Sequence, residues 1–141
     1  MLLELFIYFN GNCREAVEFY AKVFKSEVGN LMTYGEAPQA PNHSVPDADK
    51  ERVLYAGVPI GKSVVMFSDV PYSSEFVKGN NINPTVSMDN KDEVTRIYNE
   101  LKEGGKVLME LGQTFFSEWY CMVEDKFGVI WQILHYVSQA Q

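Results

Sequence analysis

The densest group of polar side chains that could bind a ligand lies in the second half of the chain. Asn83, Thr85 and Ser87 alternate along one predicted strand, so a period of two places all three on one face. Buried amide and hydroxyl groups each need a hydrogen-bond partner. We therefore expect a polar wall of a binding cleft. If the phase is shifted by one residue, these side chains face solvent instead, with Val86 and Met88 inward.

A second candidate is a lone amide in an apolar strand near the C-terminus. Gln132 lies between Ile130 and Leu134, where its side chain either bonds within the core or reaches a pocket; we favour the pocket. Phe115 and Trp119 could stack on a ligand, although aromatic side chains in strands belong more often to the core.

The residue types that bind metals or act as nucleophiles are scattered. His43 and His135 have no second histidine or carboxylate at ligand spacing, which favours surface or loop positions. Cys13 and Cys121 lack a C-x-x-C spacing, and we expect reduced, buried, inert thiols. Asp69 ends a predicted strand, where it caps the following turn or lines the rim of a cleft. Neither a Ser-His-Asp nor a Cys-His arrangement can be argued.

The composition is that of an ordinary globular protein with an acidic balance. The chain has 141 residues, of which 46% are hydrophobic, and 12 basic against 19 acidic residues give a net charge of −7. This balance, without a Lys/Arg cluster, argues against binding to nucleic acids or to an anionic membrane surface. No run approaches the roughly 20 apolar residues of a membrane span. We expect a cytoplasmic protein.

The elements that must position these side chains follow one order twice. Residue 12 is a predicted helix cap, since Asn12 is followed three residues later by Glu15. In the second half, Asp89 or Asn90 caps the helix and a Gly-Gly pair at 104–105 ends it. The first half predicts strands at 2–9, 27–35, 51–58 and 62–69 and a helix at 12–24; the second predicts strands at 83–88, 106–111, 116–124 and 129–135 and a helix between the first two.

The two halves match when one is shifted along the other. A shift of 78 residues places the helix stripe of 16–23 on that of 94–101 and Leu5 on Asn83. For the later strands the shift is 66, which places Met66 on Gln132. The extra length falls in the segment 36–50, which has no apolar periodicity and is typical of a lid, a binding loop or a mobile connection.

We therefore predict an α+β fold built from tandem βαβββ units. The halves 1–72 and 78–141 form one domain over 1–141, and their curved mixed sheets surround a cleft.

Several runs resemble a known family. NGNCREAVEFY at 10–20, DKFG at 125–128, and GGKV at 104–107 leading to QTF at 113–115 are together similar to the PhnB-like branch of the vicinal oxygen chelate superfamily. That superfamily includes glyoxalase I, extradiol dioxygenases and bleomycin-resistance proteins. The resemblance covers nearly the whole chain and implies the paired βαβββ fold and a homodimer.

In metal-using members of that superfamily, four His or Glu ligands project from the first and fourth strands of each half. The resemblance carries these positions to Leu5, Met66, Asn83 and Gln132. A divalent transition metal requires imidazole, thiolate or carboxylate ligands, so we expect neither a metal nor another cofactor here. Trp119 departs from the small or basic residue expected in the branch.

We expect a protein that binds a small apolar or aromatic molecule in its cleft. The predicted lining is Leu5, Ile7, Met66, Asn83, Thr85, Phe115, Trp119 and Gln132, with Asp69 at the rim. One alternative is a lyase, isomerase or dioxygenase-type enzyme with a displaced metal site that uses Asp69, His135 or His43. Another is an interaction module with a filled cleft. The methyltransferase label carried by the branch has no support, because the turn at 10–12 has a single glycine.

Overall fold

The computed structural model describes residues 1–39, 41 and 44–136. The chain divides between Val77 and Lys78 into two compact units. No helix in the described part is long and apolar enough to cross a membrane.

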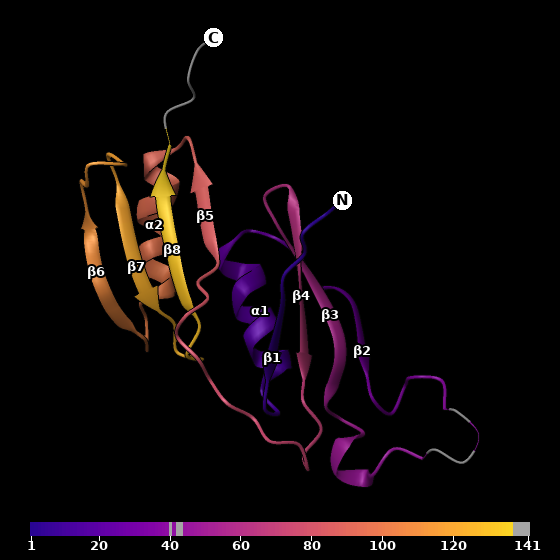
Figure 1. The fold of residues 1–141 in the computed structure, drawn as a ribbon. Coiled ribbons are helices and arrows are strands. Elements are labelled where there is room, and N and C mark those ends of the chain that lie inside the picture. The colour runs from indigo at the N-terminus through magenta and orange to yellow at the C-terminus, as the bar shows by residue number, and fades with distance from the viewer. Residues whose placement is uncertain (40, 42–43, 137–141) are drawn as a thin grey trace. The chain divides into compact units, whose positions relative to one another are not determined.

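The first unit is a four-stranded mixed sheet with one helix (Figure 1). The strand order is β1-β4-β3-β2, with β1 parallel to β4 and the other neighbours antiparallel. Helix α1 packs against β3 and β4. The elements are β1 (Phe6–Phe9), α1 (Cys13–Val23), β2 (Gly29–Thr33), the 3-10 helix η1 (Asp47–Asp49), β3 (Val53–Ile60) and β4 (Ser63–Asp69).

The second unit repeats this plan. Its strand order is β5-β8-β7-β6, with β5 parallel to β8 and the other neighbours antiparallel, and α2 packs against β7 and β8. The elements are β5 (Thr85–Met88), α2 (Lys91–Leu101), β6 (Lys106–Gly112), β7 (Tyr120–Glu124) and β8 (Ile130–His135). The predicted α+β fold with two mixed sheets is confirmed.

Each helix is held by an apolar stripe that its sequence period creates. In α1, Cys13, Ala16 and Tyr20 are fully buried, and the Tyr20 ring stacks on Phe67 of β4 with centroids 5.4 Å apart. The small side chains at 13 and 16 let the helix approach the sheet closely. In α2 the buried stripe is Val94, Ile97 and Leu101. Burial of one stripe and one sheet face makes the core of each unit.

The two helices begin with different caps. Asn90 accepts a hydrogen bond from Glu93 N at 3.1 Å, which decides between the two caps predicted for α2. Asn12 is the N-cap residue of α1 as predicted, but the predicted capping bond is wrong, because the Asn12 side chain makes none. The carboxylate of Asp69 in β4 accepts the Cys13 N–H instead, at 3.0 Å.

Two predicted strands, 2–9 and 116–124, begin four residues later in the structure. β1 pairs with β4 only from residue 6 onward, so Leu2 and Leu3 lie beyond the sheet and are 79% and 96% exposed. β7 begins at residue 120, because a turn precedes it in which Thr114 N donates to Ser117 O at 2.8 Å.

Part of the predicted loop 36–50 is structured. Gly35 N donates to Lys50 O at 3.0 Å, which extends the β2–β3 pairing into the loop. Within the loop, η1 brings in the buried Asp49, whose carboxylate accepts the Tyr72 N–H at 2.8 Å. The role of this loop as a lid stays a prediction.

Candidate functional site

Each sheet has one face against its helix and one face that its own unit leaves open. In the second sheet the register pairs Val86 with Ile133, which is fully buried, so Val86 lies on the α2 side. Alternation then places the intervening side chains on the other side. We call this side the second open face; it carries Thr85, Ser87, Tyr120, Met122, Gln132 and Leu134.

A chain of hydrogen bonds crosses the second open face. The Tyr120 hydroxyl donates to Gln132 Oε1 at 2.9 Å, and Gln132 Nε2 donates to Asn83 Oδ1 at 3.3 Å. Asn83 Nδ2 then donates to the carbonyl oxygen of Asn80 at 3.3 Å. We call Asn83, Gln132 and Tyr120 the amide chain. The Thr85 hydroxyl donates beside it to Asn83 O at 3.1 Å.

The direction of the amide chain is fixed at the Asn80 end. A backbone carbonyl only accepts, so the nitrogen of the Asn83 amide must face Asn80. Asn83 Oδ1 then accepts from Gln132 Nε2, which leaves Gln132 Oε1 to accept the proton of the Tyr120 hydroxyl. Each amide therefore keeps one orientation.

The predicted group of Asn83, Thr85 and Gln132 does come together on one face of one unit. Thr85 and Ser87 are exposed, while Val86 and Met88 are half-buried on the α2 side. The side chains thus point away from the helix, and the unit alone leaves them uncovered. Whether they line a cleft stays a prediction.

The prediction that Leu5, Ile7 and Met66 share one face of the first sheet is wrong. Ile7 pairs with the buried Phe67, which places Ile7, and Leu5 two residues before it, on the α1 side. Met66 pairs with Phe6 and lies on the opposite face. Leu5 and Ile7 therefore do not share a face with Met66.

The face that Met66 does occupy is rich in aromatic and methionine side chains. The Phe6 ring stacks on Tyr8 at 5.1 Å and meets Tyr55 edge-on at 6.5 Å. Met32 joins them because it pairs with Tyr55 in the register. Phe6 and Tyr8 are missing from the sequence-based prediction, because a strand that is apolar at every position does not reveal its phase.

The predicted aromatic residues separate. Trp119 Nε1 donates to Thr95 Oγ1 of α2 at 2.7 Å, which turns this side chain toward the helix and away from the second open face. Phe115 is 100% exposed and touches Phe116 edge-on at 5.1 Å. Phe116 in turn meets Tyr120 at 5.0 Å, so Phe115 ends an aromatic row that leads to the amide chain.

Asp69 has a structural role in place of the predicted rim position. It is 1% exposed, and its Oδ1 accepts the N–H groups of Gly11 and Cys13 at 2.8 and 3.0 Å. Its Oδ2 accepts the N–H of Val53 at 2.9 Å. Three donors on one carboxylate join the first turn of α1 to the start of β3.

The cysteines are placed as predicted for inert thiols. Both are buried, and burial raises the pKa of Cys13 to about 12 and that of Cys121 to about 11. His135 pairs with Met88 on the α2 side, and its Nδ1 is buried without a hydrogen-bond partner among the described residues. His43 lies outside the described residues.

The side chains at the superfamily's ligand positions do not suit a transition metal. Leu5 offers no donor atom, and Met66 offers only a thioether. The amides of Asn83 and Gln132 are bonded to each other. Within the described ranges, no three His, Cys, Asp or Glu side chains lie together where they could hold a metal ion.

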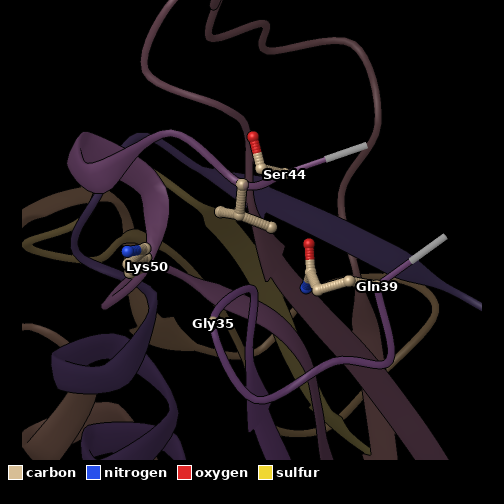
Figure 2. Close-up of a pocket in the computed structure, with 5 residues that line it drawn as sticks. Gly35, Gln39, Ser44 and Lys50 are labelled. Carbon is tan, nitrogen blue, oxygen red and sulfur yellow. The ribbon is translucent and has the colours of Figure 1, made fainter. Parts of the chain in front are cut away.

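One open pocket lies in the loop of the first unit (Figure 2). Its volume is about 270 Å³, and it is lined by Gly35, Gln39, Ser44, Val45 and Lys50. The Lys50 ammonium is paired with Asp47 at 2.7 Å, and Gln39 Nε2 donates to Tyr34 O and Ala37 O. The side chains of Lys50 and Gln39 thus bond within the loop itself.

A sequence model of the family described as 3-demethylubiquinone-9 3-methyltransferase matches residues 3–134. The chain belongs to this family. Protein YjdN of Escherichia coli (strain K12) is 28% identical over 141 residues, covering 94% of each chain. Protein PA1353 from Pseudomonas aeruginosa is 30% identical with a TM-score of 0.82, covering 95% of this chain and 98% of that one.

Two further solved structures are similar to this chain. A PhnB protein from Bacillus cereus is 25% identical with a TM-score of 0.77, covering 96% of this chain and all of that one. A glyoxalase/bleomycin resistance protein/dioxygenase family enzyme from Burkholderia phytofirmans PsJN is 14% identical with a TM-score of 0.63, covering 95% and 97%. The latter shares the fold. The predicted resemblance to PhnB proteins is confirmed, and the predicted glyoxalase/bleomycin-resistance-like fold is confirmed as a fold.

Proposed function

We propose that the protein binds a small, largely apolar molecule on the second open face without a bound metal. The observation that carries the proposal is the amide chain. It holds two carboxamides and a phenol in fixed orientation among the apolar side chains of Met122 and Leu134. Fixed polar groups within an apolar surface are typical of small-molecule sites.

The predicted role of the other residues follows from their placement. Met66, with Phe6 and Tyr8, gives the open face of the first sheet an apolar and aromatic surface of its own, which suits an apolar ligand. Phe115 lies at the outer end of the aromatic row that reaches Tyr120. We assign no binding role to Leu5, Ile7 or Trp119, which face the helices.

The activity named in the family's description is not part of the proposal. A nucleotide-type cofactor needs a strand-to-helix turn whose N–H groups are open to the ligand. In the turn between β1 and α1, the N–H groups of Gly11 and Cys13 are bonded to the Asp69 carboxylate. A displaced metal site that uses Asp69 meets the same obstacle, because three N–H groups already occupy this carboxylate.

The proposal is tested by a screen of small aromatic and apolar compounds by thermal shift. Binding to the folded state alone raises the melting temperature. We expect hits with the native protein and a loss of the shift in Asn83→Leu and Gln132→Leu. Asn99→Leu, an exposed amide on α2, is the matched control and keeps the shift. Equal shifts of the melting temperature in all four proteins, with folding intact, would refute the proposal.

A homodimer is part of the proposal as well. Light scattering coupled to size exclusion measures the mass directly, and a mass of one chain at working concentrations would refute it.

A further inference from the structure

The amide chain limits which polar group a ligand can present. This inference rests on the proposed function, because it concerns the same face. We propose that the ligand carries a neutral group with both a hydrogen-bond donor and an acceptor, such as a carboxamide or a lactam, on an apolar body.

The first step is the hydrogen-bonding capacity left after the internal bonds are made. Gln132 Nε2 has two N–H groups, and one is used on Asn83 Oδ1. Tyr120 and Thr85 have donated their only protons to Gln132 Oε1 and Asn83 O, so their oxygens can only accept from a ligand. The Tyr120 side chain is 4% exposed whereas Thr85 is exposed, so the face offers a ligand a donor at Gln132 and an acceptor at Thr85.

The second step is charge. The six side chains of the second open face are all neutral. The next residue of β7 on that side is Glu124, which pairs with Ile130 in the register. Lys106 of β6 pairs with Glu124 in the register, so the nearest ammonium and carboxylate offset each other. An anion bound to the six neutral side chains is therefore desolvated without a charged group of opposite sign in contact with it. A carboxylate ligand is thus disfavoured.

The third step compares neutral groups. A hydrocarbon would cover the remaining N–H of Gln132 without replacing its bond to water, which costs free energy. A ketone accepts from Gln132 but leaves the oxygen of Thr85 without a donor. A carboxamide or lactam supplies both a C=O and an N–H, so it matches both the donor at Gln132 and the acceptor at Thr85.

Three probes of one shape test the inference: benzamide, acetophenone and benzoate, titrated to their solubility limits. Backbone amide NMR shifts of residues 83, 85–87, 120–124 and 130–134 report the binding. We expect benzamide to bind at least about tenfold tighter than benzoate, equivalent to about 1.4 kcal/mol, with acetophenone between them.

Two variants make the result specific. Gln132→Glu keeps the shape and removes the N–H donor, so we expect a loss of about tenfold or more in benzamide affinity. Asn99→Asp makes the same change on the exposed surface of α2 and leaves the affinity unchanged. Thermal melts establish that both variants fold.

The outcomes separate this inference from the proposed function. Equal affinities for the three probes, or tighter binding of benzoate, overturn the donor-and-acceptor inference and leave small-molecule binding in place. A benzamide affinity unchanged in Gln132→Glu also overturns it. No shift at the three segments with any probe overturns both.

Discussion

Replacing Asp69 by asparagine tests the structural role of its carboxylate. The asparagine oxygen can keep the N–H groups of Gly11 and Cys13, which both bond to Oδ1. Its NH₂ group then faces the N–H of Val53, and no hydrogen bond can form because both groups are donors. One buried hydrogen bond is lost outright, and two are weakened because the acceptor is no longer charged.

The magnitude follows from these three bonds. A buried N–H left without a partner costs about 1–3 kcal/mol, and each bond loses about 1 kcal/mol when its charged acceptor becomes neutral. Asparagine is less costly to bury than a carboxylate, which offsets part of the loss. We expect Asp69→Asn to lower the free energy of unfolding by about 3 kcal/mol, a large share of the 5–15 kcal/mol typical of domains.

Urea unfolding followed by far-UV circular dichroism measures this loss. Asp47→Asn is the matched control, because its side chain is 94% exposed and pairs only with Lys50 on the surface; we expect a change within about 0.5 kcal/mol. Hydrogen exchange at Gly11, Cys13 and Val53 localises the effect. A loss for Asp69→Asn no larger than that of the control would refute the assigned role.

The same titration tests the predicted single domain. Both tryptophans, Trp119 and Trp131, lie in the second unit, whereas Asp69 lies in the first. If the units unfold as one domain, tryptophan fluorescence shifts to lower urea together with circular dichroism. A fluorescence transition that stays in place would show two independently stable units.

Three further predictions concern other parts of the chain. The raised pKa of Cys13 means that the thiol loses its proton first in the unfolded state. The free energy of unfolding therefore falls as the pH rises from 9.0 to about 12, by up to about 1.4 kcal/mol per pH unit. Urea midpoints across this range should fall less steeply in Cys13→Ala, and identical slopes in the two proteins would contradict the assignment. Tyr120→Phe removes the donor to Gln132 Oε1 and should cost about 1 kcal/mol in fluorescence-monitored unfolding, whereas no cost would mean that this bond adds nothing. Elemental analysis of untagged, chelator-free protein should find far less than one metal ion per chain. One equivalent of metal would contradict the conclusion that Leu5, Met66, Asn83 and Gln132 do not suit a transition metal.

The repeated fold could be predicted because each unit's helix carries its own apolar stripe. The shifts of 78 and 66 residues aligned Leu5 with Asn83 and Met66 with Gln132, one position on the first and on the fourth strand of each half. The shifts could not reveal which side chains of a strand face the helix and which face away from it. Asn83 and Gln132 stand out as polar residues, so their common face was visible in the sequence, whereas Leu5 and Ile7 are apolar on a strand with no polar face.

The site in the second unit could have been completed from the sequence. The turn DKFG at 125–128 joins two antiparallel strands, and counting back from it places Met122 opposite Gln132. Tyr120, two residues earlier, then shares that face. The capping of α1 by the Asp69 carboxylate could not be predicted in this way. The pairing of β1 with β4 that brings Asp69 to the start of α1 joins residues that are far apart in the sequence.

The parallel pairing in each unit also determines when that unit can be completed during folding. β1 pairs only with β4, and β5 only with β8, so the first strand made in each unit must wait for the last. The antiparallel neighbours β3 and β4, and likewise β7 and β8, are joined by short turns and close early. We expect a nascent unit to hold a three-stranded meander first. Arrival of the leading strand then closes the sheet in one late step, which in the first unit also places Asp69 against the start of α1.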